Sequence, residues 1–63
     1  MTGLEFLRKE CKDRIAYLAA GLAAGNIPSM EDYKFVCGQI RGLEAAVVLI
    51  TDLERRMEDS DSE

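Results

Sequence analysis

The segment from Val36 to Ile50 constrains the fold most, because it is the most apolar part of the chain and is interrupted only by small or single polar residues. Its large apolar side chains recur at alternating intervals of four and three residues, the heptad pattern of coiled coils and of helices that pack along one another. This row consists of Val36, Ile40, Leu43, Val47, Ile50 and, after Glu54, Met57. The pattern predicts a helix from about residue 30 to about residue 58.

A second row of apolar and small residues lies beside the heptad row. It consists of Phe35, Gly38, Gly42, Ala46, Leu49 and Leu53. Because each glycine costs about 1 kcal/mol in helix propensity relative to alanine, we interpret the glycines as a site of close helix approach. The Gly-x-x-x-Gly spacing also occurs in membrane helix dimers, but Arg41 and Glu44 interrupt the segment, so we expect no membrane span.

The N-terminal part of the chain predicts a helix from about residue 2 to about residue 24. Thr2 and Glu5 fit a capping box at its start. Its main apolar row is Leu4, Leu7, Cys11, Ile15, Leu18 and Leu22, and its second row is Phe6, Asp13, Tyr17, Ala20 and Ala24. Acid-first pairs four residues apart predict surface ion pairs of Glu5 with Lys9 and of Glu10 with Arg14.

Residues 25–29 predict a tight turn between the two helices. Gly25 suits the left-handed conformation that ends many helices, and Pro28 prevents simple continuation. Ser29 is a good N-cap for the second helix, with Asp32 at the capping-box position. A connection this short makes the helices antiparallel neighbours, so the predicted fold is all-α, a two-helix antiparallel hairpin over residues 1–58.

Folding the chain at the middle of the turn predicts the register of the hairpin. Tyr17 is then opposite the region of Cys37, and Cys11 is opposite the region of Leu43. The two cysteines are separated by about 9 Å along the helix axis, which exceeds the reach of an unstrained disulfide. We therefore predict free, largely buried thiols, and we expect the alanines near the end of the first helix to face Gly38 and Gly42.

A two-helix hairpin cannot bury two apolar rows on each helix. We therefore expect the fold to be completed by oligomerisation into a four-helix-bundle-like assembly or by docking on a larger protein. The predicted intermolecular face consists of Phe6, Tyr17, Phe35, Gly38, Gly42, Ala46, Leu49 and Leu53. The sequence thus predicts a non-enzymatic protein that acts through protein–protein contacts.

Composition narrows the remaining classes of function. Two cysteines and no histidine make a structural zinc site untenable, and we predict no catalytic, cofactor or metal site. The net charge of −4 argues against a broad phosphate-binding surface. Residues 59–63 form an acidic tail that we expect to be disordered. We see no secretory signal, and the expected location is the cytoplasm or an assembly built there.

One alternative remains open from the charge pattern. Arg8, Lys9, Lys12 and Arg14 form the densest basic cluster of this small acidic protein. This cluster supports a small regulator that binds RNA or a host protein through a basic face of the first helix. Interspersed acids favour an ordinary solvated face instead.

The chain also resembles known helical proteins in two ways. Its length and layout are similar to Rop, an RNA-binding helical hairpin that dimerises into a four-helix bundle. Its pattern Tyr-x4-Gly-x-Ile-x-Gly-Leu-x2-Ala resembles short helical proteins encoded by tailed bacteriophages among head and tail morphogenesis genes. The residues of this pattern are Tyr33, Gly38, Ile40, Gly42, Leu43 and Ala46. The second resemblance implies a virion component or assembly factor that docks on a multimeric phage protein in the host cytoplasm or the virion.

Overall fold

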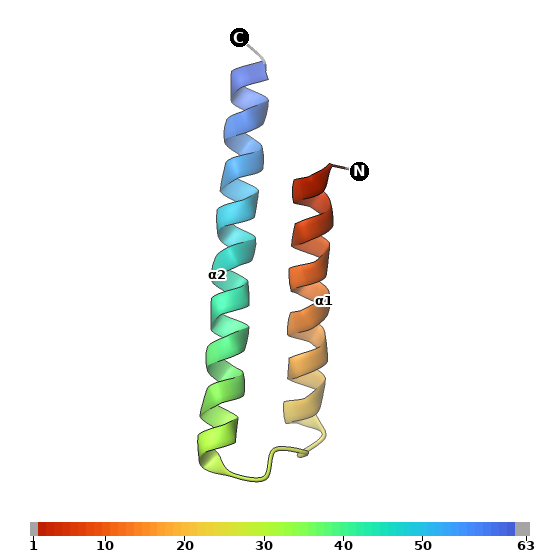
Figure 1. Ribbon diagram of the computed structural model, residues 1–63, viewed down its shortest axis with the longest axis vertical. Helices are drawn as coiled ribbons and strands as arrows, with labels where there is room; N and C mark the ends of the chain where they lie inside the picture. The colour runs from red at the N-terminus through yellow and green to blue at the C-terminus, as the bar shows by residue number, and fades with distance from the viewer. Residues whose placement is uncertain (1, 62–63) are drawn as a thin grey trace.

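The computed structural model describes residues 2–61, and the side chains of residues 2–58. It contains two antiparallel α-helices, α1 (Gly3–Ala23) and α2 (Met30–Asp61), which lie side by side (Figure 1). No strand occurs within these residues. The predicted all-α hairpin is therefore confirmed.

Both helices begin at the predicted capping residues. The Thr2 side chain accepts a hydrogen bond from the Glu5 backbone N–H at 3.1 Å. Ser29 accepts one from the Asp32 backbone N–H at 3.1 Å and donates its own hydroxyl to the Asp32 carboxylate at 3.0 Å. Each cap satisfies a backbone donor that has no partner inside the helix, and this explains why these short polar residues define the helix starts.

The end of α1 is a Schellman motif. Gly25 has a φ of 73°, the left-handed conformation predicted for it. The Gly25 N–H donates to the Leu22 carbonyl at 3.1 Å, and the Asn26 N–H donates to the Gly21 carbonyl at 3.3 Å. These bonds satisfy two of the last carbonyls of α1 and direct the chain toward α2.

The far end of α2 differs from the sequence-based expectation. The helix ends at Asp61 rather than near Glu58, so residues 59–61, which were expected to belong to a disordered tail, continue the helix. The last two residues of that predicted tail, 62–63, lie outside the described residues. In consequence α2 extends well beyond the start of α1 (Figure 1).

The two apolar rows meet along the hairpin and define its interface. The side chains along this line are buried or half-buried: Leu4, Arg8, Cys11, Ile15, Leu18 and Leu22 from α1, and Val36, Ile40, Leu43, Val47, Ile50 and Glu54 from α2. Among the apolar side chains that the structure describes, only Ile50, 7% exposed, is buried. Leu7 was expected in this row but is 49% exposed, because Arg8 takes the corresponding place in the 4–3 spacing, and Met57 at the far end is 54% exposed.

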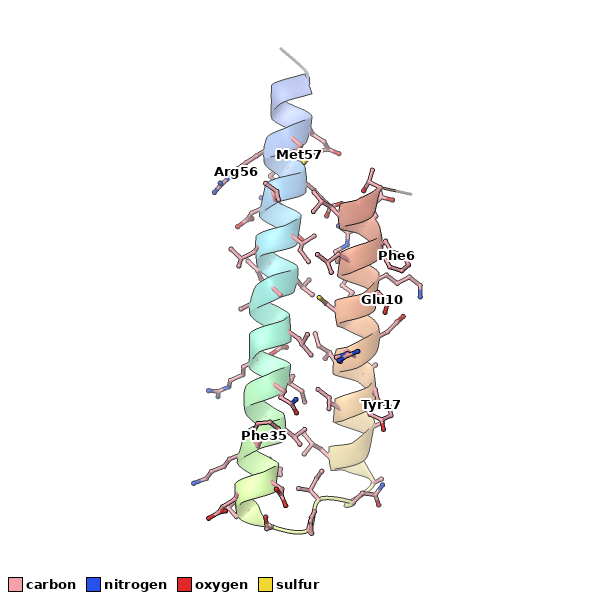
Figure 2. All side chains as sticks on the ribbon, viewed as in Figure 1. Phe6, Glu10, Tyr17, Phe35, Arg56 and Met57 are labelled. Atoms are coloured by element: carbon pink, nitrogen blue, oxygen red, sulfur yellow. The ribbon has the colours of Figure 1, made fainter. Side chains whose placement is uncertain are left out.

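The register of the hairpin is close to the predicted one. Leu18 of α1 lines a hollow together with Val36 of α2, and Tyr17 lies at nearly the same height as Phe35 (Figure 2). The prediction that Tyr17 is opposite the region of Cys37 is therefore confirmed to within about one helical turn. An ion pair between the long side chains of Arg8 and Glu54 also joins the two helices.

The connection between the helices is asymmetric. Residues 24–29 do not reverse the chain symmetrically, because α2 begins beyond the end of α1 and its first turns extend past it (Figure 1). Ile27 is half-buried and lines a hollow together with Leu18 and Val36. The connection thus covers part of the first turns of α2.

Neither described helix contains a segment that is long and apolar enough to cross a membrane.

Candidate interaction surface

Half of the large apolar side chains that the structure describes are exposed. The most exposed are Tyr17 at 78%, Leu49 at 69%, Met30 at 67% and Phe35 at 66%. Phe6, Leu7, Tyr33, Val48, Leu53 and Met57 are each between 46% and 59% exposed. A hairpin has one shared interface, so these side chains have no second helix to cover them.

The total exposed area is also large for a chain of this mass. The accessible surface is 5061 Å² for a 7.0 kDa chain. A compact monomer of that mass is expected to expose about 4,000 Å². The radius of gyration is 15.1 Å, whereas a compact domain of this length is expected to have one of about 11 Å. The hairpin therefore presents about 1,000 Å² more surface than a self-sufficient domain.

A groove runs between the helices along one side of the hairpin. Its lining consists of Glu10, Asp13, Arg14, Tyr17 and Leu18 from α1 and Gln39, Gly42 and Leu43 from α2. Because residues three or four apart on a helix share a side, the groove residues identify the rows that continue along it in both directions. We call this side the groove face. Its rows are Gly3, Leu7, Glu10, Arg14, Tyr17 and Gly21 on α1, and Phe35, Gln39, Gly42, Ala46, Leu49, Leu53 and Arg56 on α2.

The groove face contains most of the residues predicted for an intermolecular face. Tyr17 and Gly42 line the groove itself. Phe35, Ala46, Leu49 and Leu53 follow Gly42 along the same side of α2 by helical spacing. The structure thus brings six of the eight predicted residues to one side of the hairpin.

The other two predicted residues differ from these six. Gly38 lines a separate hollow, with Tyr33, Lys34, Cys37 and Arg41 around it, all from α2. Phe6 projects from the edge of α1 that is turned away from α2, along which Glu10 and Tyr17 also lie (Figure 2). Gly38 therefore does not belong to the groove face, whereas Phe6 lies at its outer edge.

The expected contact between glycines of α2 and alanines of α1 is wrong. A Cβ atom added at Gly38 or Gly42 would meet no atom within 4 Å beyond the local helix. Both residues are exposed, since they lie to the side of the row that packs on α1. The two glycines therefore do not close the hairpin, and any close approach at Gly42 involves something outside this chain.

Sequence reasoning missed Leu7, Glu10 and Arg14 as members of the groove face. Leu7 was placed in the helix interface, and the two charged residues were interpreted as an intrachain ion pair. Their 4–3 spacing with Gly3, Tyr17 and Gly21 was the signal that could have identified them.

The structure separates the four residues of the predicted basic patch. Arg8 is half-buried against Glu54 in the helix interface. Lys9 pairs with the Asp13 carboxylate at 2.9 Å instead of with Glu5. This hydrogen bond, and then the charge of Asp13, raises the pKa of Lys9 above its usual value. Arg14 lines the groove among acidic residues, so only Lys12 remains exposed away from these contacts.

The described residues hold no group of three or more side chains suited to binding a metal ion. Cys11 and Cys37 are free thiols, as predicted, but each is half-buried rather than largely buried. This difference follows from the thin hairpin, which has only one interface in which to bury them.

Comparison with protein families, with curated proteins and with solved structures found no match to this chain.

Proposed function

We propose that this protein is a non-enzymatic helical hairpin that acts by packing against other polypeptide, either by self-association or by docking on a larger assembly. The observation that carries this proposal is the exposed apolar surface of the groove face. Leu49 is 69% exposed, Phe35 66% and Tyr17 78%, and all three belong to it.

Burial of this surface supplies the energy for association. Covering a leucine or aromatic side chain completely contributes about 1.5 to 3 kcal/mol. The hairpin itself buries almost no side chain fully, so its own stability is small for the same reason. Association and folding of this protein are therefore expected to be coupled.

The setting that we propose is assembly of a multimeric particle such as a tailed bacteriophage. Its support is the short sequence pattern from Tyr33 to Ala46 that resembles phage morphogenesis proteins. The regulator alternative has less support, because Arg8 and Lys9 are each engaged by a carboxylate.

The solution mass of the purified protein, measured by light scattering over a wide range of concentration, tests the proposal. We expect either a defined oligomer of the 7.0 kDa chain or a poorly helical chain that lacks its partner. A stable, fully helical monomer that remains soluble at every concentration would contradict the proposal, since its apolar face would then need no partner.

A further inference from the structure

We propose that the groove face packs on the groove face of a second copy of this chain about a two-fold axis parallel to the helices, so that α1 of each copy lies against α2 of the other. This inference rests on the proposed function and names its partner. A rotation about such an axis moves no residue along the helices. The relative heights of α1 and α2 within one hairpin therefore also decide which residues meet between the two copies.

Two hollows that both helices line give these heights. Tyr17 of α1 and Gln39 of α2 line the groove, and Leu18 and Val36 line the hollow beside the connection. Counted along antiparallel helices, the two pairs agree to within two residues, about 3 Å or half a helical turn. Tyr17 of one copy is therefore level with Gln39 of the other to within about half a turn.

From this level the two rows of the groove face meet in step along the hairpin. Both rows have the same alternating spacing of four and three residues, and they run in opposite directions, so each residue of one row meets one residue of the other. The resulting pairs are Gly3 with Leu53, Leu7 with Leu49, Glu10 with Ala46, Arg14 with Gly42, Tyr17 with Gln39, and Gly21 with Phe35. The two-fold axis forms every pair twice.

The glycines of these rows provide space for large side chains of the second copy. A Cβ atom added at Gly3, Gly21 or Gly42 would meet no atom within 4 Å beyond the local helix. Leu53 and Phe35 of the second copy, 46% and 66% exposed in the single hairpin, enter the first two of these open spaces. The third receives the aliphatic part of the facing arginine.

The remaining pairs are matched in polarity. Leu7 and Leu49 are both apolar and exposed, 49% and 69%, so each covers the other. Glu10 and Arg14 are four residues apart on α1 with the acid first, so each keeps an opposite charge within reach when the groove is covered. Their facing residues are alanine and glycine, which place no competing charge against them.

The orientation and the area of the groove face fit one partner of this size. Its rows lie about 100° around each helix from the rows that pack within the hairpin, so each helix gains a second antiparallel neighbour, as in a four-helix bundle. A stable interface buries about 800 Å² on each partner, and the surface in excess of a compact monomer is about 1,000 Å². A single second copy therefore accounts for most of the excess.

Opposite charges introduced at the contact of Leu7 with Leu49 test this pairing. Leu7→Glu and Leu49→Lys each bury a charge against a leucine of the other copy, so each variant alone should weaken dimerisation by at least about tenfold. In an equal mixture, the mixed dimer joins the new carboxylate to the new ammonium at one contact and keeps two leucines at the other. We expect native mass spectrometry to show the mixed dimer at least about tenfold above its statistical share.

The mixture distinguishes this arrangement from others that use the same face. If α1 lay against α1 of the second copy, the two introduced charges would not meet and the mixed dimer would not be enriched. Leu7→Glu mixed with Val48→Lys is the matched control, since Val48, 59% exposed, lies one residue away on another side of α2. We expect no enrichment of the mixed dimer in this control.

A change of size at a second contact tests the same pairing without charge. Gly21→Leu fills the space proposed for Phe35 of the other copy and should weaken dimerisation, although nothing in its own chain lies within 4 Å of the added Cβ atom. Phe35→Ala empties that space. A mixed dimer of the two variants has leucine against alanine at one contact and the unmodified residues at the other, so it should again be enriched. This mixture decides the pairing if a charged variant is poorly helical by circular dichroism.

Three outcomes would overturn the inference. A dimer in which neither mixture enriches the mixed species uses another face or another arrangement, which leaves the proposed function standing. If the unmodified protein is a poorly helical monomer, the partner is a different protein, and this also leaves the proposed function standing. A stable helical monomer contradicts both the inference and the proposed function.

Discussion

Arg8 and Glu54 are charged residues within the apolar rows of the hairpin, and their side chains form an ion pair between the two helices. Each is half-buried, and a charge partly removed from water without a partner costs free energy. The pairing therefore offsets the cost of placing both charges in the interface. The break at Glu54 was visible in the sequence, but the replacement of Leu7 by Arg8 in the row of α1, and so the cation that pairs with Glu54, was not predicted.

Removal of either partner of this pair should destabilise the protein. Arg8 is 32% and Glu54 20% exposed, so the pair is partly screened by water and we expect Arg8→Ala or Glu54→Ala to cost about 1 kcal/mol. The double variant should cost less than the sum of the two single variants, because neither charge is then left alone. Urea unfolding followed by circular dichroism measures this cycle.

Lys9→Ala is the control for that cycle, since the pair of Lys9 with Asp13 is exposed and local to α1. We expect it to leave the urea midpoint unchanged. Exact additivity of the two Arg8 and Glu54 substitutions would contradict the role assigned to their pair.

At the scale of elements, the sequence predicted the local features, the helix cap and the turn glycine, but it missed how the side chains of α2 are oriented toward α1. Ser29 and Gly25 act within a few residues, and both behave as predicted. The rotation of α2 about its axis depends on how the whole apolar row meets α1, so Gly42 was placed in the hairpin interface although it lies open beside it.

Substitution of the helical glycines separates their effect on the hairpin from their effect on assembly. An added Cβ at Gly38 or Gly42 meets no tertiary neighbour, so Gly38→Ala should stabilise the helix by up to about 1 kcal/mol. Gly42→Leu should also preserve helicity, but it adds bulk to the groove face and should weaken assembly. Gly38→Leu is the matched control outside the groove face. Equal assembly of the two leucine variants, measured by sedimentation equilibrium, would remove Gly42 from the interface.

The observed register also supports the expectation for the thiols. Leu18 and Val36 line one hollow, which places Cys11 level with about Leu43, so Cys37 lies about 9 Å away along the hairpin axis. We expect mild oxidation to produce no disulfide within one chain. Alkylation and mass measurement of the monomer after oxidation should find both thiols free, and an intrachain bridge would contradict the register.

At the scale of the whole molecule, the sequence predicted that two apolar rows per helix exceed what a hairpin can bury. The exposed Tyr17 and Leu49 agree with this expectation. It did not predict which exposed residues share a side, because that depends on the register and rotation of two helices relative to each other. Gly38 was assigned to the candidate face from a neighbouring row, and only the packed hairpin separates it from that face.

Two adjacent residues of α2 provide the sharpest test of a one-sided interaction surface. Leu49, 69% exposed, belongs to the groove face, whereas Val48, 59% exposed, lies on another side of the helix. Leu49→Glu should abolish assembly, because a carboxylate buried without a partner is strongly unfavourable. Val48→Glu introduces the same charge one residue away and should leave assembly intact.

Thermal unfolding at several protein concentrations shows whether each of the two variants still assembles. If association stabilises the folded state, the melting temperature of the unmodified protein and of Val48→Glu rises with concentration. The melting temperature of Leu49→Glu should be lower and independent of concentration, because that variant unfolds as a single chain. Concentration dependence that survives in Leu49→Glu but disappears in Val48→Glu would place the interaction surface on the side of α2 that carries Val48.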